Sequence, residues 1–128
     1  MDEQEVALIV GAGNGLSASL ARTFSDQGMK IALAARNTEK LTDIAVETDA
    51  KIFCCDATNL EQVNNLFSTV VTELGTPNVV VFNASARVRG AITDINPDDV
   101  KEALLITSYG GFLVGQAAAK LMVPKNRG

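Results

Sequence analysis

The chain has 128 residues, of which 47% are hydrophobic and 20% are charged, with a formal net charge of −4. This length is enough for one domain, and this composition excludes a disordered or collagen-like chain. A mildly acidic chain without a basic run is a poor candidate for binding nucleic acid or an anionic membrane surface. The longest charge-free stretch, residues 103–119, is interrupted by polar residues and is shorter than the ~20 apolar residues of a membrane span. The acidic N-terminus also lacks the pattern of an export signal. We therefore expect a cytoplasmic protein with neither a nucleic-acid nor a membrane partner.

The chain contains no histidine. This excludes Ser-His-Asp and Cys-His catalysis and every metal site that uses imidazole. The two cysteines, Cys54 and Cys55, are adjacent, so they form neither a CxxC pair nor a zinc ligand set. We interpret them as small buried side chains in a reducing compartment, and we expect no metal site.

Four strand-then-helix units follow one another along the chain. Each predicted strand is a continuous apolar run, which is typical of a parallel sheet covered on both faces. The strands are expected at residues 6–10, 31–35, 52–55 and 79–82. Right-handed crossovers then predict an α/β fold, a Rossmann-like doubly wound parallel sheet with strand order 3-2-1-4 and helices on both faces. We expect residues 1–128 to form a single domain.

Polar residues mark the expected helix starts. Thr38 is a candidate N-cap for the second helix, and Thr58 with Glu61 matches a capping box for the third. Asn96 followed by Pro97 predicts the start of the last helix, which we expect to include Val100 to Val123.

A glycine-rich turn lies directly between the first strand and its helix. Without Cβ atoms, its backbone N–H groups can approach a diphosphate, and the helix N-terminus adds about half a positive charge. The alternative is an ordinary tight turn. The strand-turn-helix context favours phosphate binding, and the residues involved are Gly11, Gly13, Asn14, Gly15 and Leu16.

Residues 11–17 resemble the Gly-x-x-x-Gly-x-Gly fingerprint of the short-chain dehydrogenase/reductase family, matching it at Gly11 and Gly15. Ser17 replaces the third glycine, and we expect it to loosen helix-on-strand contacts slightly. The resemblance covers Val6 to Gly128 and implies a nicotinamide dinucleotide cofactor bound by this domain.

Two later segments also resemble motifs of that family. Residues 56–58 resemble its adenine-contacting segment, and residues 83–85 resemble its Asn-Ala-Gly motif with serine in the last place. Asp56 would bind the adenine amino group or belong to the first turn of the helix, and both interpretations remain open. Asn83 would line the cofactor site or satisfy local backbone, and its place after a strand favours the site.

Cofactor choice follows from the end of the second strand. An NAD-preferring domain has an acidic residue there, about 20 residues beyond the glycine turn, for the ribose 2′-hydroxyl. This chain has Arg36 instead and no acid from Met29 to Thr38. A guanidinium can bind the 2′-phosphate, so we predict NADP(H) over NAD(H), with a further hydrogen bond from Asn37. The alternative is that Arg36 is a solvated loop cation.

The predicted cofactor-binding residues are therefore Gly11, Gly13, Asn14, Gly15, Leu16, Arg36, Asn37, Asp56, Ala57, Asn83, Ala84 and Ser85. Arg87 and Arg89 could meet an anionic substrate, but we interpret them as exposed loop arginines.

No catalytic residue is predicted. The resemblance implies a Tyr-x-x-x-Lys pair with an upstream serine, but the single tyrosine, Tyr109, is followed four residues later by Leu113. We interpret Tyr109 as an interface or core aromatic. Thr107 stands where the family has a supporting asparagine, and we expect it not to reproduce the donor and acceptor of a carboxamide.

Three functions remain open. The chain is the cofactor-binding domain of a short-chain oxidoreductase that is catalytically incomplete by itself, a non-catalytic nucleotide-binding or regulatory module, or an oligomerising remnant without cofactor. The apolar last helix (Val100 to Val123) and the edge strand Val79–Phe82 predict a homo-oligomer.

Overall fold

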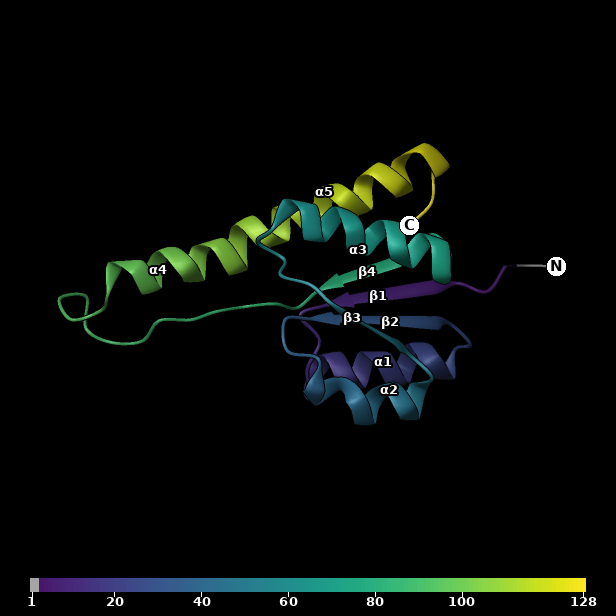
Figure 1. Ribbon diagram of the computed structural model, residues 1–128, viewed down its shortest axis with the longest axis horizontal. Helices are drawn as coiled ribbons and strands as arrows, with labels where there is room; N and C mark the ends of the chain where they lie inside the picture. The colour runs from purple at the N-terminus through teal and green to yellow at the C-terminus, as the bar shows by residue number, and fades with distance from the viewer. Residues whose placement is uncertain (1–2) are drawn as a thin grey trace.

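The computed structural model describes residues 3–128. Four parallel strands form one sheet in the order β3-β2-β1-β4, which confirms the predicted doubly wound topology (Figure 1). Their bounds are β1 (Val6–Val10), β2 (Lys30–Ala35), β3 (Lys51–Cys54) and β4 (Val79–Phe82). β3 begins and ends one residue earlier than expected, because the ladder with β2 pairs Ala32 with Lys51 and Ala35 with Cys54.

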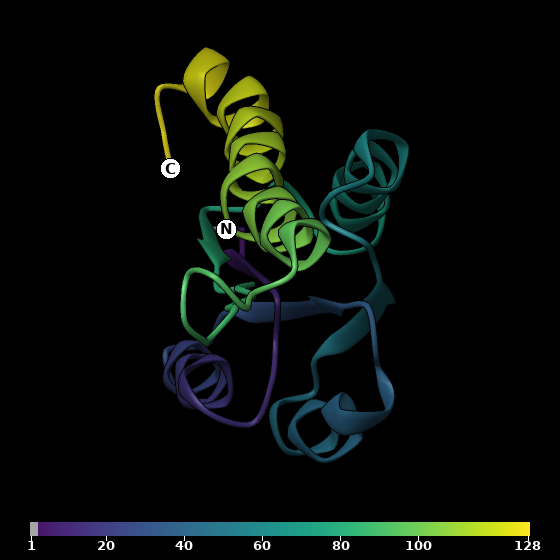
Figure 2. The same cartoon turned by 90° about the vertical axis from the view of Figure 1, so that its left-hand side faces the viewer.

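Helices cover both faces of the sheet (Figures 1 and 2). One face carries α1 (Leu16–Asp26) and α2 (Thr42–Thr48), and the other carries α3 (Leu60–Glu73) and α5 (Gly110–Met122). Strand side chains alternate between faces. Leu8 of β1 therefore packs in the core beneath α3 and α5, whereas its neighbour Ile9 packs beneath α1 and α2, and both are fully buried.

The start of α3 differs from the expected capping box. The N-cap is Asn59, whose Oδ1 accepts from the Gln62 N–H at 3.0 Å. The Gln62 side chain in turn accepts from the Asp56 N–H at 2.8 Å. The prediction of Thr58 and Glu61 is wrong by one residue, because the Thr58 hydroxyl donates to Asp56 instead.

Of the other two predicted helix starts, the one at Thr38 is wrong and the one at Asn96 is confirmed. Thr38 makes no capping bond; Asn37 Oδ1 accepts from the Glu39 N–H at 3.1 Å, and a 3₁₀ turn precedes α2. At α4 (Pro97–Leu104), Asn96 Oδ1 accepts from the Asp98 N–H at 2.8 Å, as predicted.

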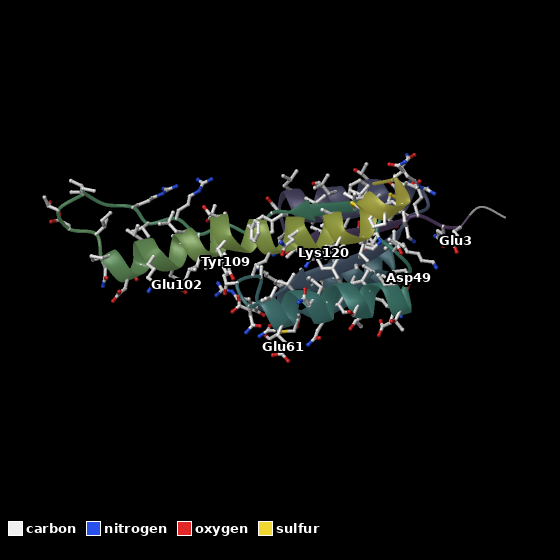
Figure 3. The ribbon with its side chains drawn as sticks, turned by 90° about the horizontal axis from the view of Figure 1, so that it is seen from above. Glu3, Asp49, Glu61, Glu102, Tyr109 and Lys120 are labelled. Carbon is white, nitrogen blue, oxygen red and sulfur yellow. The ribbon has the colours of Figure 1, made fainter. Side chains whose placement is uncertain are left out.

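The last helix is long and changes pitch part-way. α4 is joined to α5 by a π-helical turn, Leu105–Tyr109. The helix thus begins before Val100 and gives way at Val123 to a short 3₁₀ turn. α4 projects beyond the carboxyl edge of the sheet, whereas Glu3 and the C-terminus lie at the opposite edge (Figures 1 and 3). Within residues 3–128, every helix is too short or too polar to cross a membrane.

Candidate functional site

The carboxyl ends of the four strands meet at a cleft of about 210 Å³. Ligands of open α/β sheets bind at this edge, outside the strand ends. Predicted residues that line the cleft are Gly11, Arg36, Asn37, Asp56, Ala57, Asn83, Ala84 and Ser85. Predicted residues that do not line it are Gly13, Asn14 and Gly15, in the turn before α1, and Leu16, the first residue of α1. Lining residues that sequence reasoning missed include Lys40 and Thr58.

Gly11 is required by the geometry of the turn. Its φ is +80°, a conformation that side-chain-bearing residues rarely adopt. A Cβ at this position would lie 2.3 Å from the backbone nitrogen of Ala84. The N–H groups of Gly11 and Ala12 both donate to the Ala34 carbonyl, at 2.9 and 3.0 Å. The glycine thus lets three strand ends approach one another around the cleft.

The N-terminus of α1 has no side-chain cap. Gly15 occupies the N-cap position without a capping bond, and the first turn contains no acidic residue. By contrast, α3 and α4 are capped by Asn59 and Asn96. The first N–H groups of α1 are therefore available to an anion from outside the helix.

Ser17 joins the glycine turn to the loop after β4. It is 2% exposed, and its Oγ accepts from Asn83 Nδ2 at 2.9 Å. The expected loosening by this serine is therefore offset by a hydrogen bond between side chains. Asn83 lines the cleft, and its side-chain amide donates to the Ser17 side chain rather than to local backbone.

Asp56 takes part in the turn before α3. Its Oδ1 accepts from the Thr58 hydroxyl at 2.7 Å and from the Thr58 N–H at 2.9 Å. These two bonds, with a smaller attraction from Arg36, lower the pKa of the Asp56 carboxyl below its usual value. Asp56 is thus an ionised carboxylate that organises the helix start and also faces the cleft.

Arg36 brings positive charge to the cleft. Within residues 3–128, the ion pairs join Arg22 to Glu47, Lys51 to Glu73 and Arg127 to Glu5, so no carboxylate pairs with the Arg36 side chain. Its backbone carbonyl accepts from the Cys54 thiol at 3.4 Å. Asn37 uses its oxygen to cap the following turn, which leaves its amide NH₂ as the group available to a ligand.

The chain matches the family model for short chain dehydrogenases over residues 5–128. It belongs to this family. An uncharacterized oxidoreductase of Staphylococcus aureus (strain USA300) is 29% identical over 127 residues, which cover 97% of this chain and 55% of that protein. The (21S)-21-acetoxyl-apo-melianone synthase of Melia azedarach is 33% identical over 131 residues, covering 98% of this chain and 48% of that protein.

Solved structures of the family share the fold. A short-chain type dehydrogenase/reductase from Mycobacterium marinum has a TM-score of 0.90 and 30% identity, covering 96% of this chain and 52% of its own. An actinorhodin polyketide ketoreductase variant, solved with NADPH, has a TM-score of 0.92 and 26% identity, covering 98% and 51%. This chain thus spans about half the length of the short-chain dehydrogenases that it matches.

Thr107, at the place of the family's supporting asparagine, makes a donor and an acceptor contact. Its Oγ1 accepts from the Ala86 N–H at 3.1 Å and donates to the Ala86 carbonyl at 3.3 Å. These contacts come from a single hydroxyl oxygen, whereas a carboxamide offers its donor and its acceptor from separate atoms, so the expectation that threonine does not replace the carboxamide stays a prediction. The hydroxyl ties the π-helical turn to the loop after β4.

Tyr109 lies at the end of that turn and outside the cleft lining. It is 43% exposed, so it is not a core aromatic. Figure 3 shows it between Glu102 and Lys120 along the long helix. Arg87 and Arg89 are both exposed, and they line a separate groove with Arg36 beside α4.

The two cysteines differ. Cys55 is buried, and its burial raises the pKa of the thiol to about 11, with smaller contributions from Asp56 and Cys54. Cys54 is exposed, which corrects the prediction that both are buried, because consecutive residues at a strand end point to opposite sides. Within residues 3–128, there is no cluster of three or more histidine, cysteine, aspartate or glutamate side chains that could hold a metal ion.

Proposed function

We propose that residues 1–128 form one NADP(H)-binding domain of a short-chain oxidoreductase, with NADP(H) preferred over NAD(H). The observation that carries the preference is Arg36, a guanidinium without a carboxylate ion-pair partner in residues 3–128, at the carboxyl end of β2. An acidic residue at this place would repel a 2′-phosphate, whereas a guanidinium binds it through charge-assisted hydrogen bonds.

The diphosphate of the cofactor would lie at the glycine turn. Support comes from the uncapped N-terminus of α1 and from Gly11, which brings the turn against the loop after β4. The similar ketoreductase was solved with NADPH, which agrees with this assignment. The nicotinamide cofactor supplies hydride transfer when bound; the residues of this chain bind and orient it.

Calorimetric titration of the 128-residue chain with NADPH and NADH tests the proposal. We expect NADPH to bind about tenfold tighter or more, since one charge-assisted bond to a phosphate has that order of effect. Arg36→Leu should bring the two affinities together. Arg127→Leu, at the opposite edge of the sheet, should leave their ratio unchanged. Equal affinity, or tighter NADH binding, in the unmodified chain would refute the preference.

We further propose that these residues are catalytically incomplete. The single tyrosine is followed at the fourth position by Leu113, and that leucine is 4% exposed in the core. NADPH oxidation with this chain should not exceed the rate in buffer, and measurable turnover would contradict the proposal. Absence of nucleotide binding would favour an oligomerising remnant instead.

We also infer self-association in a reducing, cytoplasmic setting. Large apolar side chains stay exposed along the last helix, among them Leu104 (60%) and Phe112 (59%). Within residues 3–128, β4 pairs only with β1 and lies at an edge of the sheet. Such surfaces favour contact with a second copy of the chain. The two free cysteines agree with a reducing environment.

A further inference from the structure

We propose that Lys40 is the second cation of the cleft and that it recognises, together with Arg36, the 2′-phosphate of the cofactor. Lys40 would then be a specificity-determining residue. The inference rests on the proposed function, because it concerns the same cleft and the same ligand.

The backbone that carries Lys40 is held on both sides. It lies in the 3₁₀ turn Glu39–Leu41, where the Glu39 N–H donates to Asn37 and the Leu41 N–H donates to Thr38. The Leu41 side chain is fully buried and anchors the turn in the core. The position of Lys40 is therefore set by the fold rather than by a mobile loop.

The side chain of Lys40 reaches across to the glycine turn. Its Nζ lies 4.0 Å from the place where a Cβ on Gly13 would be, and the residue lines the same cleft as Arg36. The ammonium group thus lies beside the turn expected to hold the diphosphate, in the cleft that Arg36 also lines. A ligand that occupies both the turn and the Arg36 side of this cleft comes within reach of a cation at Lys40.

Lys40 decides whether the cleft lining carries a net positive charge. The charges of this lining come from Arg36, Lys40 and Asp56. Asp56 is ionised, so these three side chains sum to one positive charge, and the sum would be zero without Lys40. Lys40 takes part in none of the ion pairs within residues 3–128. The cleft therefore keeps a net positive charge only while Lys40 is present.

This net charge matters more for a phosphomonoester than for the diphosphate. The diphosphate meets backbone N–H groups and the positive end of α1, which bind anions without a cationic side chain. A 2′-phosphate carries up to two negative charges and lies away from that helix end, so its binding depends on cations. Removal of Lys40 should consequently weaken phosphorylated ligands selectively.

The test is titration of the 128-residue chain and of Lys40→Met with 2′,5′-ADP and with 5′-ADP. Methionine keeps an unbranched stem but removes the charge. We expect a loss of about tenfold for 2′,5′-ADP and less than about twofold for 5′-ADP. Lys40→Arg should retain most of the affinity for 2′,5′-ADP. Lys120→Met, an exposed lysine on α5, should change neither value.

The outcomes separate the two proposals. If the unmodified chain does not prefer 2′,5′-ADP, the NADP(H) assignment fails and the role of Lys40 fails with it. If that preference is present but Lys40→Met leaves it unchanged, only the role of Lys40 is refuted. An equal loss for both ligands would assign Lys40 to the shared 5′ portion and would also refute its role in specificity.

Discussion

Gly11 leaves β1 with a φ of +80° and faces the backbone of Ala84. Gly11→Ala would add both left-handed strain and a clash with the backbone nitrogen of Ala84 in the loop after β4. We expect the free energy of unfolding to fall by about 2–4 kcal/mol, measured by urea denaturation.

The same substitution elsewhere provides the control. Gly115 lies within α5, and a Cβ there meets no atom within 4 Å. Gly115→Ala should raise the free energy of unfolding by about 0.5–1 kcal/mol, because alanine loses less backbone entropy in a helix. Equal effects of the two changes would contradict the steric role of Gly11.

The Thr58 hydroxyl is the largest cause of the lowered pKa of Asp56. Thr58→Val removes this donor but keeps the backbone N–H, so the Asp56 pKa should rise part of the way towards its usual value. Because the folded pKa is lowered, Asp56 stabilises the native state above the unfolded pKa, and this stabilisation is lost as the pH falls through the folded value. An NMR titration of the Asp56 carboxyl checks the shift, and an unchanged pKa in the variant would disprove this cause.

At the scale of single elements, α3 depends on its cap. Asn59→Ala removes the acceptor for the Gln62 N–H and should destabilise the protein by about 1 kcal/mol, measured by thermal or urea unfolding. Asn64→Ala changes the same residue type at an exposed position inside α3, where alanine is the better helix former. Asn64→Ala should therefore be neutral or slightly stabilising, and a loss equal to that of Asn59→Ala would argue against capping.

The π-helical turn in the long last helix positions residues at the cleft. The π-helical turn places Ile106 in the cleft lining and Thr107 against Ala86. Just after it, Gly110 and Gly111 bring α5 close to Ala57 and Phe82, where Cβ atoms would come within 3.4 and 3.2 Å of their nearest neighbours. The helix start and the loop after β4 are thus held as one unit.

At the scale of the whole molecule, several large apolar side chains remain exposed along the last helix. Leu104 is 60% exposed, Leu105 is 40% exposed and Phe112 is 59% exposed. We expect sedimentation at tens of micromolar to show a dimer or larger species. Phe112→Lys should shift it towards monomer, because a charge in an apolar contact is costly. Val46→Lys, at an 81% exposed site on α2, should leave the oligomeric state unchanged, and a monomeric unmodified chain would refute self-association.

The predictions that held depend on local patterns. Continuous apolar strands and helical spacing predicted the parallel sheet and its order, and Asn96 with Pro97 predicted the start of α4. The predictions that failed involve competition between neighbouring polar groups. Thr58 could cap α3 or bond Asp56, and only the folded turn shows the second. The contact of Thr107 with Ala86 could not be predicted for another reason, because it joins residues 21 positions apart.

The sequence by itself determined the fold, the glycine turn and the presence of a cation at the end of β2. The apolar runs, the turn and the cation are local patterns, and right-handed crossovers convert the runs into one strand order. Only the tertiary structure decided that Ser17 bonds Asn83, that Cys54 and Cys55 differ in exposure, and that Lys40 reaches the glycine turn. These contacts join loops that the parallel crossovers bring to one edge of the sheet. Spacing along the chain carries no direct signal of them.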